Sequence, residues 1–168
     1  MKNTKKLAFA SLMSALGVAF MYVGALFEVL DLSTAAIASI CVLLVLTELG
    51  GRYAWLTYAV TGVLPLQLLP QKFAAVLFLG FLGFYPMAKS FFERKFRGWR
   101  CLVLKILLLN ICTFLMLLAV RYVVAEALWF EIMTLVLANI VFVVYDVALT
   151  RLLHAYVFVW RKKLKMKF

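Results

Sequence analysis

The chain has 168 residues, of which 67% are hydrophobic and 15% are charged, and its mean hydropathy is +1.07. A soluble domain averages about half apolar and about a quarter charged residues, so this composition excludes an ordinary soluble domain and indicates an integral membrane protein. The net charge of +11 does not indicate a nucleic-acid partner, because the basic residues lie between and after apolar segments, where they set orientation and meet anionic lipid headgroups. The length predicts one membrane domain over residues 1–168.

The first apolar segment, Leu7 to Leu30, is long enough to cross a bilayer and follows several lysines. It is too long for the apolar core of a signal peptide, so we expect a retained first helix. Ser11, Ala15 and Ala19 recur at every fourth residue and leave one stripe of this helix nearly bare of side chains. A bare stripe allows close approach of another helix, either from this chain or from another protein, because packing contacts hold helices together in lipid.

The second segment, Thr34 to Glu48, is short for a membrane span and rich in small residues. Asp31 and Ser33 precede it, and both are residue types that favour a helix N-cap. We therefore expect the helix to begin directly after them. Gly50 and Gly51 predict its end.

The third segment, Tyr53 to Leu69, and the fourth, Phe73 to Phe92, each contain a proline. A proline inside a helix removes a backbone donor and crowds the preceding turn. We therefore expect a kink at Pro65 and a kinked or loosened helix at Pro86.

The fifth and sixth segments are Cys101 to Val124 and Ile132 to Trp160, so the sequence predicts an all-α fold, a compact bundle of six transmembrane helices. Basic residues show a strong bias between the two sides of the membrane, which sets orientation. One side carries the N-terminal lysines, Arg52, the loop from Lys89 to Arg100 and the C-terminal tail, whereas the other carries only Lys72 and Arg121. This bias predicts a multi-pass protein of the cell membrane with both termini in the cytoplasm.

The polar residues inside the predicted spans are few, and they define the candidate site. Asp146 lies near the middle of the sixth segment, where a carboxylate costs about 2.5–3.5 kcal/mol on insertion scales, so we expect it to face the bundle interior with Lys105 or Arg151 as partner. Asn139 lies two helical turns before Asp146 on the same face. Asn110 and Arg121 share one face of the fifth segment in the same way.

These two faces predict an outward-opening pocket for a small polar ligand. Its candidate ligand-binding residues are Asn110, Arg121, Trp129, Asn139 and Asp146, where Trp129 belongs to the outer connection. Polar and aromatic side chains at the mouth of a pocket suit such a ligand. The alternative is that the two asparagines and the aspartate are interhelical contacts that hold the bundle together.

Enzymatic chemistry has little support in the sequence. The three cysteines are unevenly spaced and form neither a metal motif nor a disulfide framework. His154 is the only histidine, and no second ligand or nucleophile lies beside it, so we expect no metal site, no catalytic residue and no cofactor. A phosphate-binding glycine loop is also missing from the sequence, since Gly50-Gly51 is too short for one.

Six predicted spans, internal termini and the Ala15-xxx-Ala19 spacing together resemble the substrate-binding S components of energy-coupling factor (ECF) transporters, which share an alanine-spaced motif in their first helix. The resemblance covers nearly the whole chain in topology. It implies capture of a vitamin or another micronutrient from outside. It also implies docking, through Ser11, Ala15 and Ala19, on a transmembrane coupling subunit that works with two ATPase subunits. In that family the subunit is thought to topple in the membrane and carry its ligand inward.

Two alternatives remain open from the sequence. The size and span number are also similar to the rod-shape-determining membrane protein D family, which implies a small scaffold of a cell-envelope assembly without a small-molecule ligand. In the third interpretation, the bare stripe of the first helix only packs against the other helices of the same chain. Exposure of that stripe favours a partner, and burial favours internal packing.

Overall fold

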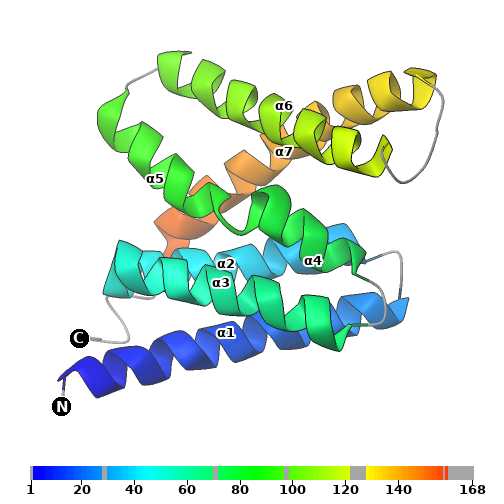
Figure 1. The fold of residues 1–168 in the computed structure, drawn as a ribbon. Helices are drawn as coiled ribbons and strands as arrows, with labels where there is room; N and C mark the ends of the chain where they lie inside the picture. The colour runs from blue at the N-terminus through cyan, green and yellow to red at the C-terminus, as the bar shows by residue number, and fades with distance from the viewer. Residues whose placement is uncertain are drawn as a thin grey trace. The chain divides into compact units, whose positions relative to one another are not determined.

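The computed structural model describes the chain apart from residues 1, 28–29, 70–71, 97–98, 122–127, 157 and 159–168, and it describes the backbone alone at residues 2, 119–121, 128–132 and 134. Every regular element within the described residues is a helix (Figure 1), as the sequence predicts. Five helical stretches of this part are long and apolar enough to cross a membrane, which indicates a multi-pass membrane protein. They are Asn3–Phe27, Asp31–Leu49, Phe73–Lys95, Trp99–Leu118 and Leu135–Ala155.

The chain divides into two compact units. The N-terminal unit comprises the described residues of Met1–Ser90, and the C-terminal unit comprises those of Phe91–Leu164. Each unit has its own helix contacts and is described by itself. The single six-helix domain stays a prediction.

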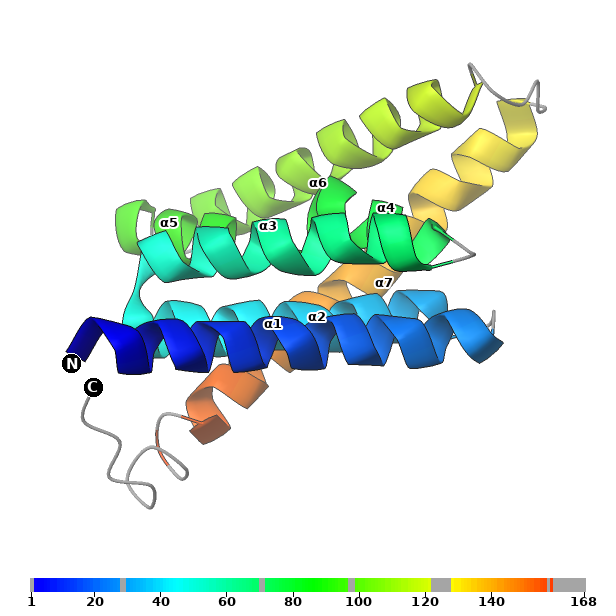
Figure 2. The ribbon, with the colours of Figure 1, turned by 60° about the horizontal axis from the view of Figure 1, so that its bottom comes forward.

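In the N-terminal unit, three long helices pack against one another and against a shorter one (Figures 1 and 2). These helices are α1 (Lys2–Phe27), α2 (Asp31–Leu49), α3 (Gly51–Leu68) and α4 (Phe73–Leu77). Each of these four helices contacts the other three. Ala35, Ala38, Ala54 and Ala74 are fully buried here, and such small side chains let helix backbones approach closely.

The start of α2 differs from the prediction. The helix begins at Asp31, so Leu30 occupies the N-cap position and Asp31 lies in the first turn, where it is buried. The Thr34 amide donates to the Leu30 carbonyl at 2.9 Å, and the Thr34 hydroxyl donates to the same oxygen at 3.0 Å. The prediction of Asp31 and Ser33 as N-caps is therefore wrong, because the backbone ladder already starts at Leu30. The added turn lengthens a segment that looked short to 19 residues.

The boundary between α2 and α3 lies at a glycine, as predicted. Gly50 has φ of +89°, which an L side chain rarely adopts, and Gly51 opens α3. Pro65 lies inside α3, one turn before its last residue. The helix α3 is not among the five spans, because its sequence is less apolar than theirs.

The fourth predicted segment is a helix with a defect before Pro86. After α4, residues Phe78–Leu82 form a π-helical turn, and a short break precedes α5 (Tyr85–Lys95), which Figure 1 shows as a change of direction. The Gly83 amide donates to the Phe78 carbonyl at 2.7 Å, five residues back. Because Pro86 has no amide hydrogen, the regular ladder cannot continue through this point. The predicted loosening at Pro86 is confirmed.

The C-terminal unit contains a pair of long helices, α6 (Trp99–Arg121) and α7 (Leu128–Ala155), which cross each other (Figure 1). Residue 105 pairs with residue 146, and residue 110 pairs with residue 139, so the two helices run antiparallel. Many apolar side chains of this pair are exposed, among them Leu137 and Val144. Exposed apolar side chains are expected on helices that face lipid tails.

Candidate functional site

The predicted small-residue stripe of α1 lies at the surface. Ser11, Ala15 and Ala19 are all exposed, while the adjacent Leu12 and Leu16 are also open to the surroundings. The stripe is therefore a shallow strip between larger apolar side chains. A second helix can approach the α1 backbone closely along it.

A second set of small residues, on another face of α1, packs the N-terminal unit. Ser14 and Gly17 are buried there. A Cβ placed on Gly17 would lie 2.7 Å from Thr61 Cγ2 of α3, and one placed on Gly24 would collide with Thr34 of α2. These glycines permit the close contacts of α1 with its neighbours inside the unit, so the exposed stripe is separate from the internal interface.

Asn110 and Asn139 lie together, as the predicted facing stripes require. Asn110 Nδ2 donates to Asn139 Oδ1 at 3.2 Å, and Asn139 Nδ2 donates to Asn110 Oδ1 at 3.0 Å. Each Nδ2 also donates to the carbonyl four residues earlier in its own helix, Ile106 at 2.9 Å and Leu135 at 2.8 Å. Each amide thus uses both of its N–H groups within the helix pair. This geometry is that of an interhelical clamp.

Asp146 pairs with Lys105, one of the two predicted partners. Lys105 Nζ lies 3.3 Å and 3.2 Å from the two carboxylate oxygens of Asp146, and 2.8 Å from Glu93 Oε1 of α5. The lysine side chain is 8% exposed, against 19% for Asp146 and 41% for Glu93. Arg151, the other predicted partner, is exposed. Ionised groups in apolar helices need such pairing, because isolated charges are costly there.

The other two predicted ligand-binding residues lie outside the part of the chain whose side chains are described. Arg121 is the last residue of α6, and Trp129 belongs to the first turn of α7. The structure therefore brings together Asn110 with Asn139, and Asp146 with Lys105. Both pairs lie on the contacting faces of α6 and α7.

A groove of about 640 Å³ lies beside Asn110. Its other lining residues are apolar, from Val103 to Leu115 on α6 together with Leu135 of α7. Asn110 is the one polar residue of this lining, and its amide is engaged with Asn139. The groove therefore offers an apolar ligand more contact than a polar one.

Groups that could support metal or thiol chemistry are sparse in the described residues. Among them, no three His, Cys, Asp or Glu side chains are close enough to hold a metal ion. The cysteines Cys41, Cys101 and Cys112 are free thiols. His154 is exposed near the end of α7, with Phe158 as a ring neighbour at 6.2 Å.

Two features were missed by the sequence analysis. Glu93 joins Lys105 across a loop, where helical spacing gives no signal. The hydroxyl oxygens of Thr57 and Thr61, one turn apart on α3, are fully buried, and no hydrogen-bond partner is present for them among the described residues. Their four-residue spacing was a visible signal that they share a face.

Comparison with protein-family models, with curated proteins and with solved structures gives no match to this chain.

Proposed function

We propose that this chain is a substrate-capture subunit, similar to the S components of ECF importers, that docks on a transmembrane coupling subunit through α1. The observation that supports this most directly is the exposure of Ser11, Ala15 and Ala19, while a different set of small residues packs α1 inside its unit. Small residues on a lipid-facing strip give up apolar contact area, which a closely approaching partner helix restores.

The proposed arrangement has six spans, with α3 crossing alongside the five more apolar helices and with both termini in the cytoplasm of a bacterial cell. A small polar ligand such as a vitamin would be captured from outside at the outer ends of α6 and α7, with Arg121 and Trp129 as binding residues. Asn110, Asn139 and Asp146 would reach the ligand only by exchanging their present partners. ATP hydrolysis would be supplied by two partner ATPase subunits.

The experiment measures both the docking of the chain on its partner subunits and the stability of its fold. The double variant Ala15→Leu/Ala19→Leu fills the exposed strip, and we expect the complex with the coupling and ATPase subunits to be lost in native mass spectrometry of gently solubilised membranes. Its melting temperature in detergent should stay that of the wild type, because Ala15 and Ala19 are exposed. Ala59→Leu, at another exposed alanine of the same unit, is the matched control and should keep the complex.

Two outcomes would contradict the proposal. One is a wild-type spectrum without any protein partner or small-molecule ligand. The other is a fall in melting temperature for Ala15→Leu/Ala19→Leu as large as that for Gly17→Leu, since this would place the strip in an internal interface.

A second candidate, a ligand-free scaffold of a cell-envelope assembly, is favoured by a specific observation. Four polar side chains of the α6–α7 pair bind one another, in the Asn110–Asn139 and Lys105–Asp146 contacts. A scaffold would use the same exposed strip of α1 for a protein partner. The substitution Asn139→Leu separates the two: it should weaken retention of a bound small molecule in a capture subunit, and should alter only stability in a scaffold.

A further inference from the structure

The C-terminal unit carries an open apolar groove that the proposed capture function does not use. Along α6, Val103, Leu107, Ile111 and Leu115 follow one another at four-residue spacing, and each is between 43% and 58% exposed. They line the groove of about 640 Å³ together with Leu135 of α7. The groove runs along the helix for twelve residues, which at about 1.5 Å per residue is about 18 Å. This length is close to one hydrocarbon leaflet, about half of the ~30 Å apolar core of a bilayer.

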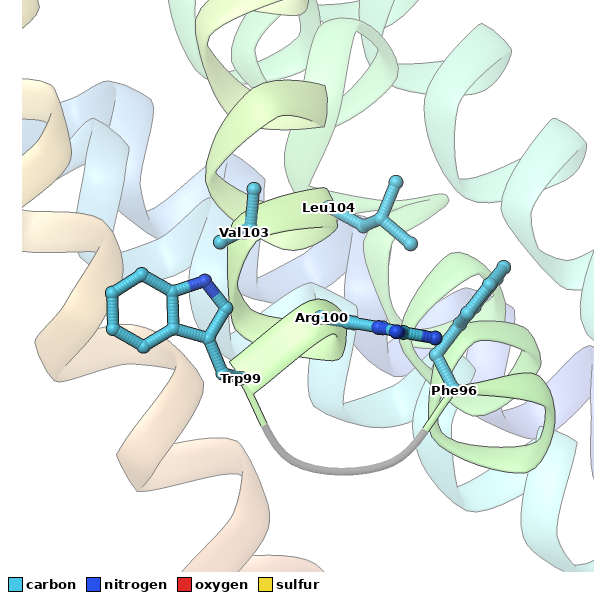
Figure 3. A pocket seen from close by; sticks show the side chains of 5 residues that line it. All are labelled: Phe96, Trp99, Arg100, Val103 and Leu104. Atoms are coloured by element: carbon cyan, nitrogen blue, oxygen red, sulfur yellow. The ribbon is translucent and has the colours of Figure 1, made fainter.

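A second cavity shares a lining residue with one end of the groove. This cavity, of about 290 Å³, is lined by Phe96, Trp99, Arg100, Val103 and Leu104, so Val103 belongs to both. Figure 3 shows the Arg100 side chain extending toward Phe96, while Trp99 lies on the other side of the start of α6. Arg100 is the one charged residue of this lining, and tryptophan is a residue type favoured at the membrane–water interface.

The charges at this end are predominantly positive. Arg94, Lys95 and Arg100 are exposed, and Lys95 Nζ lies 6.0 Å from the centre of the Phe96 ring. The antiparallel pairing of α6 and α7 places Arg151 at the same end of the helix pair. The nearby carboxylates, Glu93 and Asp146, are both bound to Lys105. An apolar slot of one-leaflet length that ends in basic side chains is complementary to a lipid with an anionic headgroup.

We infer that this groove binds one anionic phospholipid, with an acyl chain along α6 from Val103 to Leu115 and the phosphate at Arg100. A phospholipid supplies both the flexible apolar chain that fills a shallow slot and the negative charge that Arg100 attracts. A helix of a second copy, which is about 10 Å wide, is the alternative occupant that the test below distinguishes. The site is thus a specific lipid site within the membrane-exposed surface of the helix pair.

The test is native mass spectrometry of the full chain, delipidated in detergent and then exposed to equal amounts of phosphatidylglycerol and phosphatidylcholine with identical acyl chains. We expect the wild type to retain phosphatidylglycerol about fivefold over phosphatidylcholine, as one basic side chain near a lipid headgroup predicts. Arg100→Gln should reduce this ratio to about one. Arg94→Gln removes the same charge from an exposed position outside both cavities and should keep most of the preference.

A second pair of variants tests the groove. Leu107→Trp fills it and should lower retention of both lipids, whereas Leu137→Trp, at an exposed position of α7 outside the lining, should leave both unchanged. Ile111→Trp serves as a second groove variant if circular dichroism shows that Leu107→Trp has lost helix. Equal retention of the two lipids by the wild type, or equal effects of Arg100→Gln and Arg94→Gln, would overturn the site. A dimer that Leu107→Trp converts to monomer would also overturn it, because the occupant would then be a second copy.

Discussion

Lys105 is the residue at which the charged contacts of the C-terminal unit converge, because its ammonium binds both Asp146 and Glu93. The sequence predicts the first contact, since a carboxylate inside an apolar helix requires a partner and Lys105 is one of two cations within reach. The second contact could not be predicted, because Glu93 lies near the end of α5, and how the chain returns from there to α6 depends on tertiary structure. The facing asparagines were predictable from helical spacing, and their mutual pairing corresponds to the alternative in which they are interhelical contacts.

We expect Lys105→Met to lower the free energy of unfolding by about 3 kcal/mol. The substitution removes the cation that Asp146 and Glu93 share. Removal of one partner of a buried ion pair costs about 3–5 kcal/mol. We expect the lower end of this range because the Glu93 side chain is 41% exposed. Adding Asp146→Asn should restore part of the loss. Equal melting temperatures for Lys105→Met and the wild type in detergent would show that the ion pairs do not stabilise the fold.

The buried hydroxyls of Thr57 and Thr61 give a prediction of opposite sign. Thr57→Val keeps the shape of the side chain and removes a buried hydroxyl without a partner among the described residues. The free energy of unfolding should therefore rise by about 1 kcal/mol. Thr34→Val is the matched control and should destabilise, because the Thr34 hydroxyl donates to backbone carbonyls of Leu30 and Asp31. A destabilised Thr57→Val would mean that a polar partner occupies this seam of the N-terminal unit.

At the scale of helices, hydropathy and proline positions predict where the elements lie along the chain. Which face of a helix is buried, and the detailed form of the helix, depend on packing. The defect at Pro86 follows from proline chemistry, whereas the contact of its π-helical turn with α3 does not: the Tyr58 hydroxyl donates to the Leu79 carbonyl at 2.9 Å. Likewise, α1 has two sets of small residues that look equivalent in the sequence. Which set is buried depends on the partners Thr34 and Thr61, and these come from other helices.

The π-helical turn should weaken when its contact with α3 is removed. Tyr58→Phe deletes the hydroxyl that donates to the Leu79 carbonyl, so we expect a loss of about 1 kcal/mol in stability and faster amide exchange at Gly83. Tyr53→Phe, a half-buried tyrosine of the same helix, is the control for loss of a hydroxyl. Unchanged exchange at Gly83 in Tyr58→Phe would show that Pro86 alone maintains the turn.

For the whole molecule, the status of α3 decides the topology. The helix is formed as predicted, yet it is not among the five helical stretches that are long and apolar enough to cross a membrane. With α3 crossing, the span number is even and both termini lie on the same side, as the bias of basic residues predicts. With α3 at the interface, the termini would lie on opposite sides.

Reporter fusions to the two termini measure directly on which side of the membrane each terminus lies. We expect a fluorescent protein fused to either terminus to fluoresce in the cytoplasm, and alkaline phosphatase fused to either terminus to be inactive. Active phosphatase at one terminus only would contradict the six-span topology and would place α3 outside the set of spanning helices. Charge substitution at Arg52 supplies a further check, because this residue is one of the basic groups that set the orientation.

The clamp between Asn110 and Asn139 has a consequence for how the chain enters the bilayer. Alone in lipid, α6 would present the Asn110 amide and the Lys105 ammonium to hydrocarbon, and α7 would present the Asn139 amide and the Asp146 carboxylate. In the helix pair, the two asparagine amides bind each other and the Lys105 ammonium binds the Asp146 carboxylate. The two helices should therefore leave the translocon as one hairpin, so that biogenesis of the C-terminal unit waits until α7 has been synthesised.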